Sequence, residues 1–315
     1  MGPRTPLPSV NGIPAGEPRG KGQYTRLCCG TLPQPIKDRL LTINSSYLPP
    51  ESRGEAATSN RLNGRRILIF GAGQDDCDIE SPPIGNGRAM TVLFAREGAT
   101  IVAVDKNLES AEQTCAMIMQ EGGYATPVQA DVCNPDEIEA AVMVAEDIMG
   151  GIDGLIYNIG KGAAMGIESL SLDSWDSVMQ VNLRGAALVL KAAWPLLSEG
   201  ASIAITSSVA SMMPGSQIPA YDASKAGLAG LMRHAALEGS SRHIRANIIA
   251  PGLIDTAMGR AASKQRATRD STPIPLGRQG TGWDTAYMAL FLLSGEASYV
   301  TGQVMVVDGG LSTLG

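Results

Sequence analysis

From about residue 65 onward, short runs of β-branched and other apolar residues alternate with longer amphipathic stretches. The apolar runs are nearly continuous, which is typical of strands that helices cover on both faces. Regular alternation of such strands with helices indicates repeated βαβ units and therefore a parallel sheet. The predicted strands are residues 67–70, 100–104, 125–129, 154–157, 201–206, 244–249 and 303–307.

The predicted helices lie between these strands, at residues 86–97, 108–120, 135–149, 172–197, 220–238 and 283–293. Asn134 followed by Pro135 is a helix start signal, because asparagine caps the first backbone N–H groups and proline suits the first helical position. Ser171 and Asp173 give the long fourth helix a similar start. The sequence therefore predicts a three-layer, doubly wound Rossmann fold with a seven-stranded parallel sheet.

The first 60 residues have a different composition from the rest of the chain. They hold nine of the 19 prolines and seven basic against four acidic residues, with almost no periodic apolar pattern. The prolines disfavour the amphipathic helix of an organelle transit peptide. We therefore interpret residues 1–60 as a disordered N-terminal extension and residues 61–315 as a single folded domain.

Composition limits the classes of function. A net charge of -6 disfavours a nucleic-acid surface, and no apolar run is long enough to span a membrane. Five cysteines without a CxxC pair, and only two histidines, disfavour a disulfide framework, a zinc site and a Ser-His-Asp hydrolase. We therefore expect a cytoplasmic protein that uses no metal and binds neither nucleic acid nor membrane.

Glycines flank the turn between the first predicted strand and the first predicted helix. Gly71 and Gly73 follow the strand, and Gly85 and Gly87 enclose Asn86 at the start of the helix. Glycines at such a turn let a pyrophosphate approach the backbone N–H groups of the helix N-terminus. The turn is therefore a candidate dinucleotide site.

The second predicted strand ends at Asp105. A carboxylate there can accept hydrogen bonds from both ribose hydroxyls of the adenosine and would repel a 2′-phosphate. Asp105 therefore favours NAD(H) over NADP(H), although Lys106 beside it leaves NADP(H) open.

A second group of candidate residues lies further along the chain. Tyr221 and Lys225 are four residues apart at the start of a predicted helix, so both side chains lie on one face. An ammonium group near a phenol lowers the phenol pKa from about 10, which suits Tyr221 to acid–base catalysis. Ser208 follows the fifth strand at the edge of the sheet where ligands bind in such folds.

Residues 64–311 resemble the short-chain dehydrogenase/reductase family. The motifs that carry the resemblance are the glycine-rich first turn, Asp131-Val132 after the third strand, Asn158-Ile159-Gly160 after the fourth, Asn182, Ser208, Tyr221-x-x-x-Lys225, and Pro251-Gly252-x-x-x-Thr256 after the sixth. The resemblance implies an oxidoreductase that transfers a hydride between NAD(H) and a secondary alcohol or ketone. It also implies a homotetramer.

The resemblance further implies roles for single residues. Tyr221 is the general acid/base, Ser208 hydrogen-bonds the substrate oxygen, Lys225 binds the nicotinamide ribose, and Asn182 holds a proton-relay water. Residues 211–219 and 257–275 are expected to wall the substrate pocket. The implied cofactor-binding residues are Gly71, Gly73, Gly85, Asn86, Gly87, Asp105, Asp131, Val132, Asn158, Gly160, Tyr221, Lys225, Pro251, Gly252, Leu253 and Thr256.

One departure from the family pattern bears on cofactor binding. Ten residues, 75–84, are inserted within the glycine-rich loop and carry four carboxylates, which would repel a pyrophosphate unless the loop bulges into water. Two alternative functions stay open. The family scaffold and Lys106 also permit an NADPH-dependent 3-oxoacyl-thioester reductase, and the interrupted glycine loop permits a non-catalytic dinucleotide-binding or scaffolding protein.

Overall fold

The structure is a computed structural model that describes residues 48–213 and 215–314. Its central sheet has seven parallel strands in the order β3-β2-β1-β4-β5-β6-β9, so the predicted seven-stranded parallel sheet is confirmed. The strands are β1 (Arg66–Phe70), β2 (Thr100–Asp105), β3 (Ala125–Gln129), β4 (Ile152–Tyr157), β5 (Leu197–Thr206), β6 (Arg245–Pro251) and β9 (Val304–Val307).

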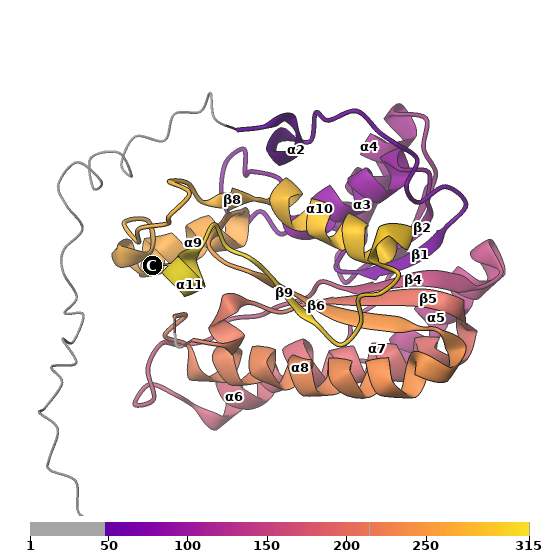
Figure 1. Cartoon of the computed structure of the whole chain (residues 1–315). Helices are drawn as coiled ribbons and strands as arrows, with labels where there is room; N and C mark the ends of the chain where they lie inside the picture. Colours follow the sequence, from indigo (N-terminus) through magenta and orange to yellow (C-terminus); the bar gives the residue numbers. More distant parts are fainter. Residues whose placement is uncertain (1–47, 214, 315) are drawn as a thin grey trace, which may run out of the picture.

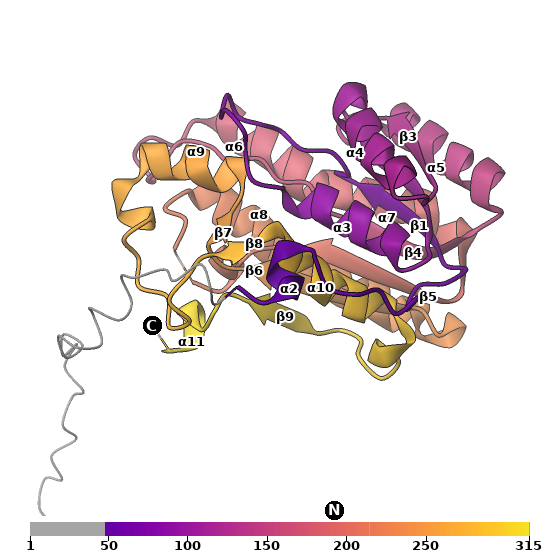
Figure 2. The same cartoon turned by 90° about the horizontal axis from the view of Figure 1, so that it is seen from above.

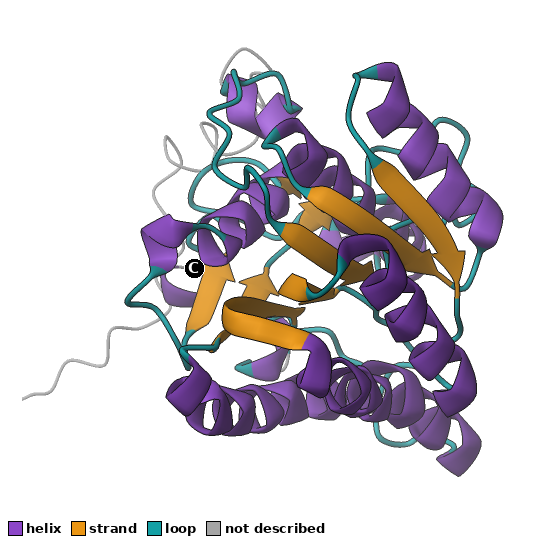
Figure 3. Ribbon diagram, turned by 90° about the vertical axis from the view of Figure 1, so that its right-hand side faces the viewer, coloured by secondary structure: helices purple, strands orange, loops and turns teal. Residues whose placement is uncertain are grey.

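Helices cover both faces of the sheet (Figures 1 and 3). Alternate residues of β1 enter two separate cores: Leu68 and Phe70 pack with one set of helices, and Ile67 and Ile69 with the other. This confirms the three-layer fold. One layer consists of α3 (Asn86–Arg96), α4 (Leu108–Gln120) and α10 (Gly282–Leu293), and the other of α5 (Pro135–Met149), α6 (Leu172–Met179), α7 (Gly185–Ala193) and α8 (Pro219–Gly239).

The predicted helix starts are present, but the long fourth helix is divided. Asn134 accepts a hydrogen bond from the backbone of Asp136, and Ser171 accepts one from that of Ser174. Residues predicted as one helix, 172–197, form α6, a π-helical turn at Gln180–Arg184, α7 and a 3-10 turn. Unpredicted elements are α9 (Ala257–Gln265), α11 (Leu311–Leu314), and the two-stranded sheet of β7 (Ile254–Asp255) and β8 (Gly280–Thr281).

The folded unit begins before the predicted boundary. α2 (Pro50–Arg53) lies beside α10 (Figures 1 and 2), and the Thr281 hydroxyl donates a hydrogen bond of 2.8 Å to the Ser52 carbonyl. The buried Glu97 carboxylate accepts from the backbone N–H groups of Ser59 and Arg61. The boundary at residue 60 is therefore wrong for residues 48–60. The rest of the predicted extension, residues 1–47, lies outside the described residues.

The helices of the described residues differ from membrane-spanning helices in length or hydrophobicity. Within residues 48–213 and 215–314, none of the helices combines the length and the hydrophobicity that crossing a membrane requires.

The start of α3 packs directly against the end of β1. A Cβ atom at Gly87 would lie 1.9 Å from the Gly71 carbonyl oxygen and 2.8 Å from Nδ2 of Asn158. Only glycine permits this approach, because the nearest atom that a side chain would meet belongs to the backbone at the end of β1 and cannot move aside as a flexible side chain could.

We expect Gly87→Ala to lower the free energy of unfolding by about 1–3 kcal/mol, because the added methyl group forces α3 away from β1. Urea denaturation followed by circular dichroism measures the effect. Gly230→Ala in α8 is the matched control, since nothing lies within 4 Å of its Cβ position and alanine favours a helix. Equal stability of the two variants would show that α3 does not depend on this contact.

Candidate active site

The predicted site residues gather at the carboxyl edge of the sheet. The chain runs outward from β1 through β2 to β3, and β4 returns to the other side of β1, so the strand order reverses between β1 and β4. Ligands of open α/β sheets bind in the crevice at such a point. The loops that meet there carry Gly71 after β1, Asp105 at the end of β2, Asn158 and Gly160 after β4, Ser208 after β5 and Pro251 at the end of β6.

The Asp105 carboxylate joins the end of β2 to the glycine-rich turn. Its Oδ2 accepts a hydrogen bond of 3.0 Å from the Gly73 N–H, and its Oδ1 accepts one of 3.1 Å from Asn107. The Asn158 amide donates to the Gly71 carbonyl at 3.2 Å, which ties the turn to β4. The turn therefore brings the N-terminus of α3 and the carboxylate at the end of β2 to the same edge of the sheet, the arrangement that dinucleotide sites use.

The insertion leaves the two halves of the glycine-rich loop together. The side-chain oxygen of Gln74 accepts a hydrogen bond of 2.7 Å from the Gly85 N–H, and the backbone N–H of Gln74 donates to the Ser110 hydroxyl at 2.6 Å. The four inserted carboxylates, those of Asp75, Asp76, Asp78 and Glu80, are exposed. The insertion therefore extends into water, and its negative charges are screened there.

Lys225 is buried beneath the Tyr221 ring. Its Nζ lies 5.7 Å from the ring centroid and donates to the carbonyl oxygens of Ile159 at 3.0 Å and Thr206 at 2.9 Å. Only 2% of the residue is exposed, and this burial lowers the pKa of Lys225 to about 7. The lysine thereby links the loops that follow β4 and β5.

The pKa of Tyr221 shifts in the opposite direction from the one expected. Burial, the largest effect, raises the pKa of the phenol, and the Asp222 carboxylate raises it further. The nearby Ser208 hydroxyl and the positive charge of Arg269 lower the phenol pKa. The prediction that Lys225 brings the phenol pKa below its ordinary value is therefore wrong for this structure, because desolvation affects both groups and disfavours the charged form of each.

Asn182 lies fully buried in the π-helical turn between α6 and α7. Its side-chain oxygen accepts from the Lys161 N–H at 2.7 Å, and its amide donates to the Lys161 carbonyl at 3.0 Å and the Ser224 hydroxyl at 2.9 Å. Both amide hydrogens are thus used by the protein, and a water at this side chain would have to bind its oxygen.

The other predicted residues lie at the same edge but differ in their surroundings. Asp131 is exposed and accepts a hydrogen bond of 2.8 Å from the Cys133 N–H, whereas Val132 is buried. Thr256 caps α9 by accepting from the Gly259 N–H at 3.1 Å. Asn86 turns its side-chain oxygen into the protein, where it has no hydrogen-bond partner among the described residues.

The end of β6 is held close to the last strand. The Gly252 N–H donates to the Val307 carbonyl at 2.9 Å, and a Cβ at Gly252 would lie 2.5 Å from the Cβ of Asp308. Pro251, the last residue of β6, is buried, and Leu253 is half-buried. This backbone forms the part of the edge expected to meet the nicotinamide.

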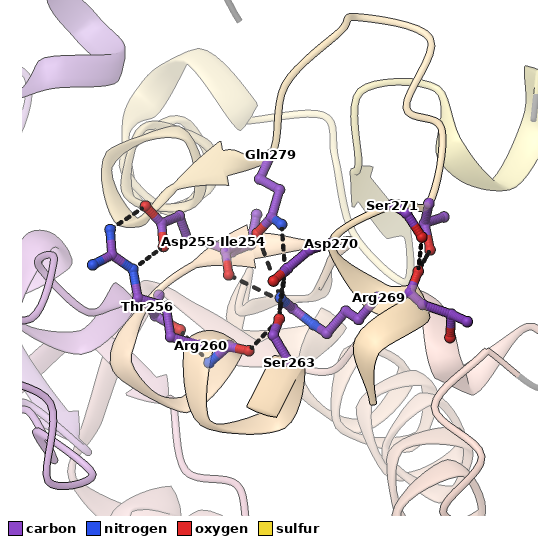
Figure 4. Close-up of polar contacts among 12 residues, drawn as sticks. Ile254, Asp255, Thr256, Arg260, Ser263, Arg269, Asp270, Ser271 and Gln279 are labelled. Carbon is purple, nitrogen blue, oxygen red and sulfur yellow. Dashed lines mark hydrogen bonds and ion pairs between the residues drawn. The ribbon is translucent and has the colours of Figure 1, made fainter. Parts of the chain in front are cut away.

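Arg269 is a site residue that the sequence did not single out. It is 7% exposed and donates hydrogen bonds to the Ile254 carbonyl, the Ser263 hydroxyl and the Gln279 side chain (Figure 4). A Cβ at Gly259 would lie 2.9 Å from its Nη2, so the glycine makes room for the guanidinium. In the sequence it is one of several basic residues in the segment 257–275, and nothing in that pattern indicates which one is buried.

Within residues 48–213 and 215–314, no group of three or more His, Cys, Asp or Glu side chains is arranged to hold a metal ion. The doubly wound sheet, the glycine-rich turn at its switch point and the tyrosine, lysine and serine beside it define a dinucleotide-dependent oxidoreductase.

Comparison with known proteins identifies the family. The family described as enoyl-(acyl carrier protein) reductase matches residues 84–312. A 3-oxoacyl-(acyl-carrier-protein) reductase of Thermotoga maritima is 35% identical over 253 residues, which are 80% of this chain and 99% of the relative. Cyclohexanol dehydrogenase of an Acinetobacter species is 33% identical over 82% of this chain and 99% of its own.

A solved structure agrees with these relatives. A short-chain dehydrogenase/reductase from Burkholderia xenovorans superimposes with a TM-score of 0.74 at 35% identity, covering 81% of this chain and 98% of its own. The chain therefore belongs to the short-chain dehydrogenase/reductase family, and it is an NAD(P)-dependent oxidoreductase that acts on CH–OH groups.

The buried Lys225 predicts a specific dependence of stability on pH. Between about pH 7, its pKa in the fold, and pH 10.5, its ordinary pKa, the unfolded chain binds one more proton than the folded chain. The destabilising contribution of Lys225 is therefore full below about pH 7 and declines as the pH rises, by at most about 1.4 kcal/mol per pH unit.

Lys225→Met removes this contribution. The free energy of unfolding of the wild-type protein, minus that of the variant, should increase between pH 7 and pH 10 when both are unfolded in urea without cofactor. A difference that stays constant over this range would contradict the lowered pKa of Lys225.

Proposed function

We propose that this protein transfers a hydride between NAD(H) and a secondary alcohol or ketone, with Tyr221 as the general acid/base. The observation that carries the proposal is the placement of the Tyr221 ring 5.7 Å from Nζ of Lys225 and close enough to Ser208 for its hydroxyl to affect the phenol, at the carboxyl edge of the sheet. These are a proton donor, a cation and a second hydroxyl at one substrate position.

Each group would have a definite task in ketone reduction. The nicotinamide ring, when bound, supplies the hydride to the carbonyl carbon. Ser208 would hold the substrate oxygen by a hydrogen bond, and the Tyr221 phenol would give its proton to that oxygen as negative charge develops on it. Alcohol oxidation would use the same groups in reverse.

Lys225 and Asn182 would support this chemistry. Two of the three N–H bonds of the Lys225 ammonium point to carbonyl oxygens, which leaves the third for a ribose hydroxyl of the nicotinamide half. Asn182 would hold a relay water through its side-chain oxygen, since its amide hydrogens have acceptors in the protein.

The cofactor would extend from the Pro251–Thr256 segment at the nicotinamide end to the glycine-rich turn at the pyrophosphate. Asp131 would face the adenine, with Val132 beneath it, while Asn158 and Gly160 would line the middle. Asp105 would accept hydrogen bonds from the ribose hydroxyls and exclude a 2′-phosphate, which favours NAD(H) over NADP(H).

The substrate would enter over an apolar depression. A hollow of about 600 Å³ lies at the start of α8 and is lined by Met165, Gly166, Ile167, Gln217, Pro219 and Asp222. Pro219 and Asp222 flank Tyr221 in the sequence, although Tyr221 itself does not line the hollow. Its lining favours a hydrophobic alcohol or ketone.

The second candidate function is an NADPH-dependent 3-oxoacyl-thioester reductase. The 35% identity to the Thermotoga maritima 3-oxoacyl-(acyl-carrier-protein) reductase supports it. Lys106, next to Asp105, would then pair with the 2′-phosphate.

We further propose a homotetramer located in the cytoplasm. Cys77, Cys115 and Cys133 form no disulfide with one another, which is typical of proteins from a reducing compartment and supports the location. Exposed apolar side chains on the outer helices, Leu172 and Leu237 among them, support self-association.

Tyr221→Phe should lower kcat by ~10²-fold or more, because it removes the transferable proton while keeping the ring. The dissociation constant for NADH should change little. Stopped-flow reduction of a panel of hydrophobic ketones, with NADH binding followed by fluorescence, measures both. Retained turnover in this variant would refute the assigned role of Tyr221.

Separate fluorescence titrations with NADH and NADPH test the cofactor. We expect tighter binding of NADH, and Asp105→Ala should reduce the ratio of the two affinities by ~10-fold, since the ribose hydrogen bonds and the repulsion of a phosphate both disappear. Asp131→Ala, which removes an exposed carboxylate elsewhere at the site, should leave the ratio unchanged.

The wild-type titration also separates the competing functions. Tighter binding of NADPH would favour the 3-oxoacyl-thioester reductase, and binding of neither would favour a scaffolding protein.

A further inference from the structure

Two segments lie at or before residue 84, where the region that the family model matches begins. One is residues 48–61, which we call the N-terminal strap, and the other is the insertion at residues 75–84. The structure connects them through the N-terminus of α10.

The strap is anchored to α10 by a buried polar network. The Ser52 hydroxyl is 3% exposed, donates to Oδ1 of Asp284 at 2.5 Å and accepts from Arg278 at 2.9 Å. Arg278 and Asp284 form an ion pair at 2.8 Å. Asp284 also caps α10 together with Thr281, so the strap contacts the residues that define the start of this helix.

A second contact lies two residues further along the strap. A Cβ at Gly54 would lie 2.3 Å from the Trp283 ring, so the strap backbone rests directly on that ring. Arg96 of α3 donates to the Gly54 carbonyl at 2.7 Å and places its guanidinium 5.1 Å from the Trp283 ring centroid. The strap therefore joins α10 to α3.

The first residue of α10 touches the glycine-rich loop. A Cβ at Gly282 would lie 2.7 Å from the Ile84 carbonyl oxygen and 3.0 Å from that of Gly85. These residues are where the insertion ends and α3 begins. Gly85 thus donates a hydrogen bond to Gln74 and also lies against the first residue of α10.

We propose that the N-terminal strap is a brace that positions Ile84 and Gly85 for the cofactor pyrophosphate and so compensates for the insertion. In an uninterrupted loop, the short covalent connection to Gly73 restricts the position of Gly85. Ten additional residues relax that restriction, and the entropy of the longer loop favours displacement. The brace restores the restriction through α10. This inference rests on one part of the proposed function, namely that a dinucleotide binds at the glycine-rich turn.

The test combines two changes in the full-length protein. Gly54→Ala displaces the strap, because its Cβ would collide with Trp283 and its φ of +72° disfavours alanine. We expect it to raise the dissociation constant for NADH ~10-fold. In a protein that lacks residues 75–84, the same substitution should raise it less than ~2-fold, because the short loop no longer needs the brace.

Arg53→Gln is the control within the strap, since this half-exposed side chain pairs with Glu55 at the surface. It should leave NADH affinity unchanged in both backgrounds. Equal effects of Gly54→Ala with and without the insertion would overturn the proposal, as would an unchanged dissociation constant in the complete protein.

Hydrogen exchange provides a reading that does not depend on the cofactor. The backbone amides of residues 84–90 should exchange faster in Gly54→Ala than in the wild-type protein. Ser52→Ala is a milder change that tests the same contact if Gly54→Ala unfolds the protein, and it should also speed exchange of these amides. Unchanged exchange of these amides in Ser52→Ala would overturn the proposal that the strap positions residues 84 and 85. Failure of the wild-type protein to bind NADH or NADPH would instead refute the proposed function, while the exchange rates would still decide whether the strap holds the loop.

Discussion

The close contact between the Gly71 carbonyl and the first turn of α3 is the constraint on which the rest of the site depends. Gly87 permits this contact because glycine has no Cβ; a Cβ at this position would lie 1.9 Å from that carbonyl oxygen. The same carbonyl accepts a hydrogen bond from Asn158, so α3, β1 and β4 meet at one backbone atom. Lys225 extends the connection from Ile159 to Thr206 and thus to β5. The pyrophosphate turn and the catalytic end are therefore parts of one backbone framework.

Electrostatics at the catalytic end follow from burial. Two cations, Lys225 and Arg269, lie close to the Tyr221 phenol, and both have lost most of their contact with water. Desolvation raises the pKa of the Tyr221 phenol and lowers the pKa of Lys225, so burial favours the neutral form of both side chains. Negative charge that develops on a substrate oxygen would be stabilised more strongly there than in water, because little solvent screens it.

The acidic loop at residues 75–84 and the strap lie at the edge of this framework. The acidic insertion is closed at its base by Gln74, which keeps Gly73 and Gly85 in one turn. The strap contacts the start of α10, whose first residue lies against the carbonyl groups of Ile84 and Gly85.

The sequence by itself determined the seven strands and most helix starts, because burial on both faces and N-terminal caps are local patterns that do not depend on distant residues. It also indicated Tyr221, Lys225 and Ser208 as candidate catalytic residues, because of their types and spacing. The π-helical turn at Asn182 and the upward shift of the Tyr221 pKa were decided by packing. So was the start of the folded unit, because Ser52 meets Asp284 across 232 residues of chain. Such pairings form only once the sheet has brought both segments to one edge, and no local pattern of composition encodes them.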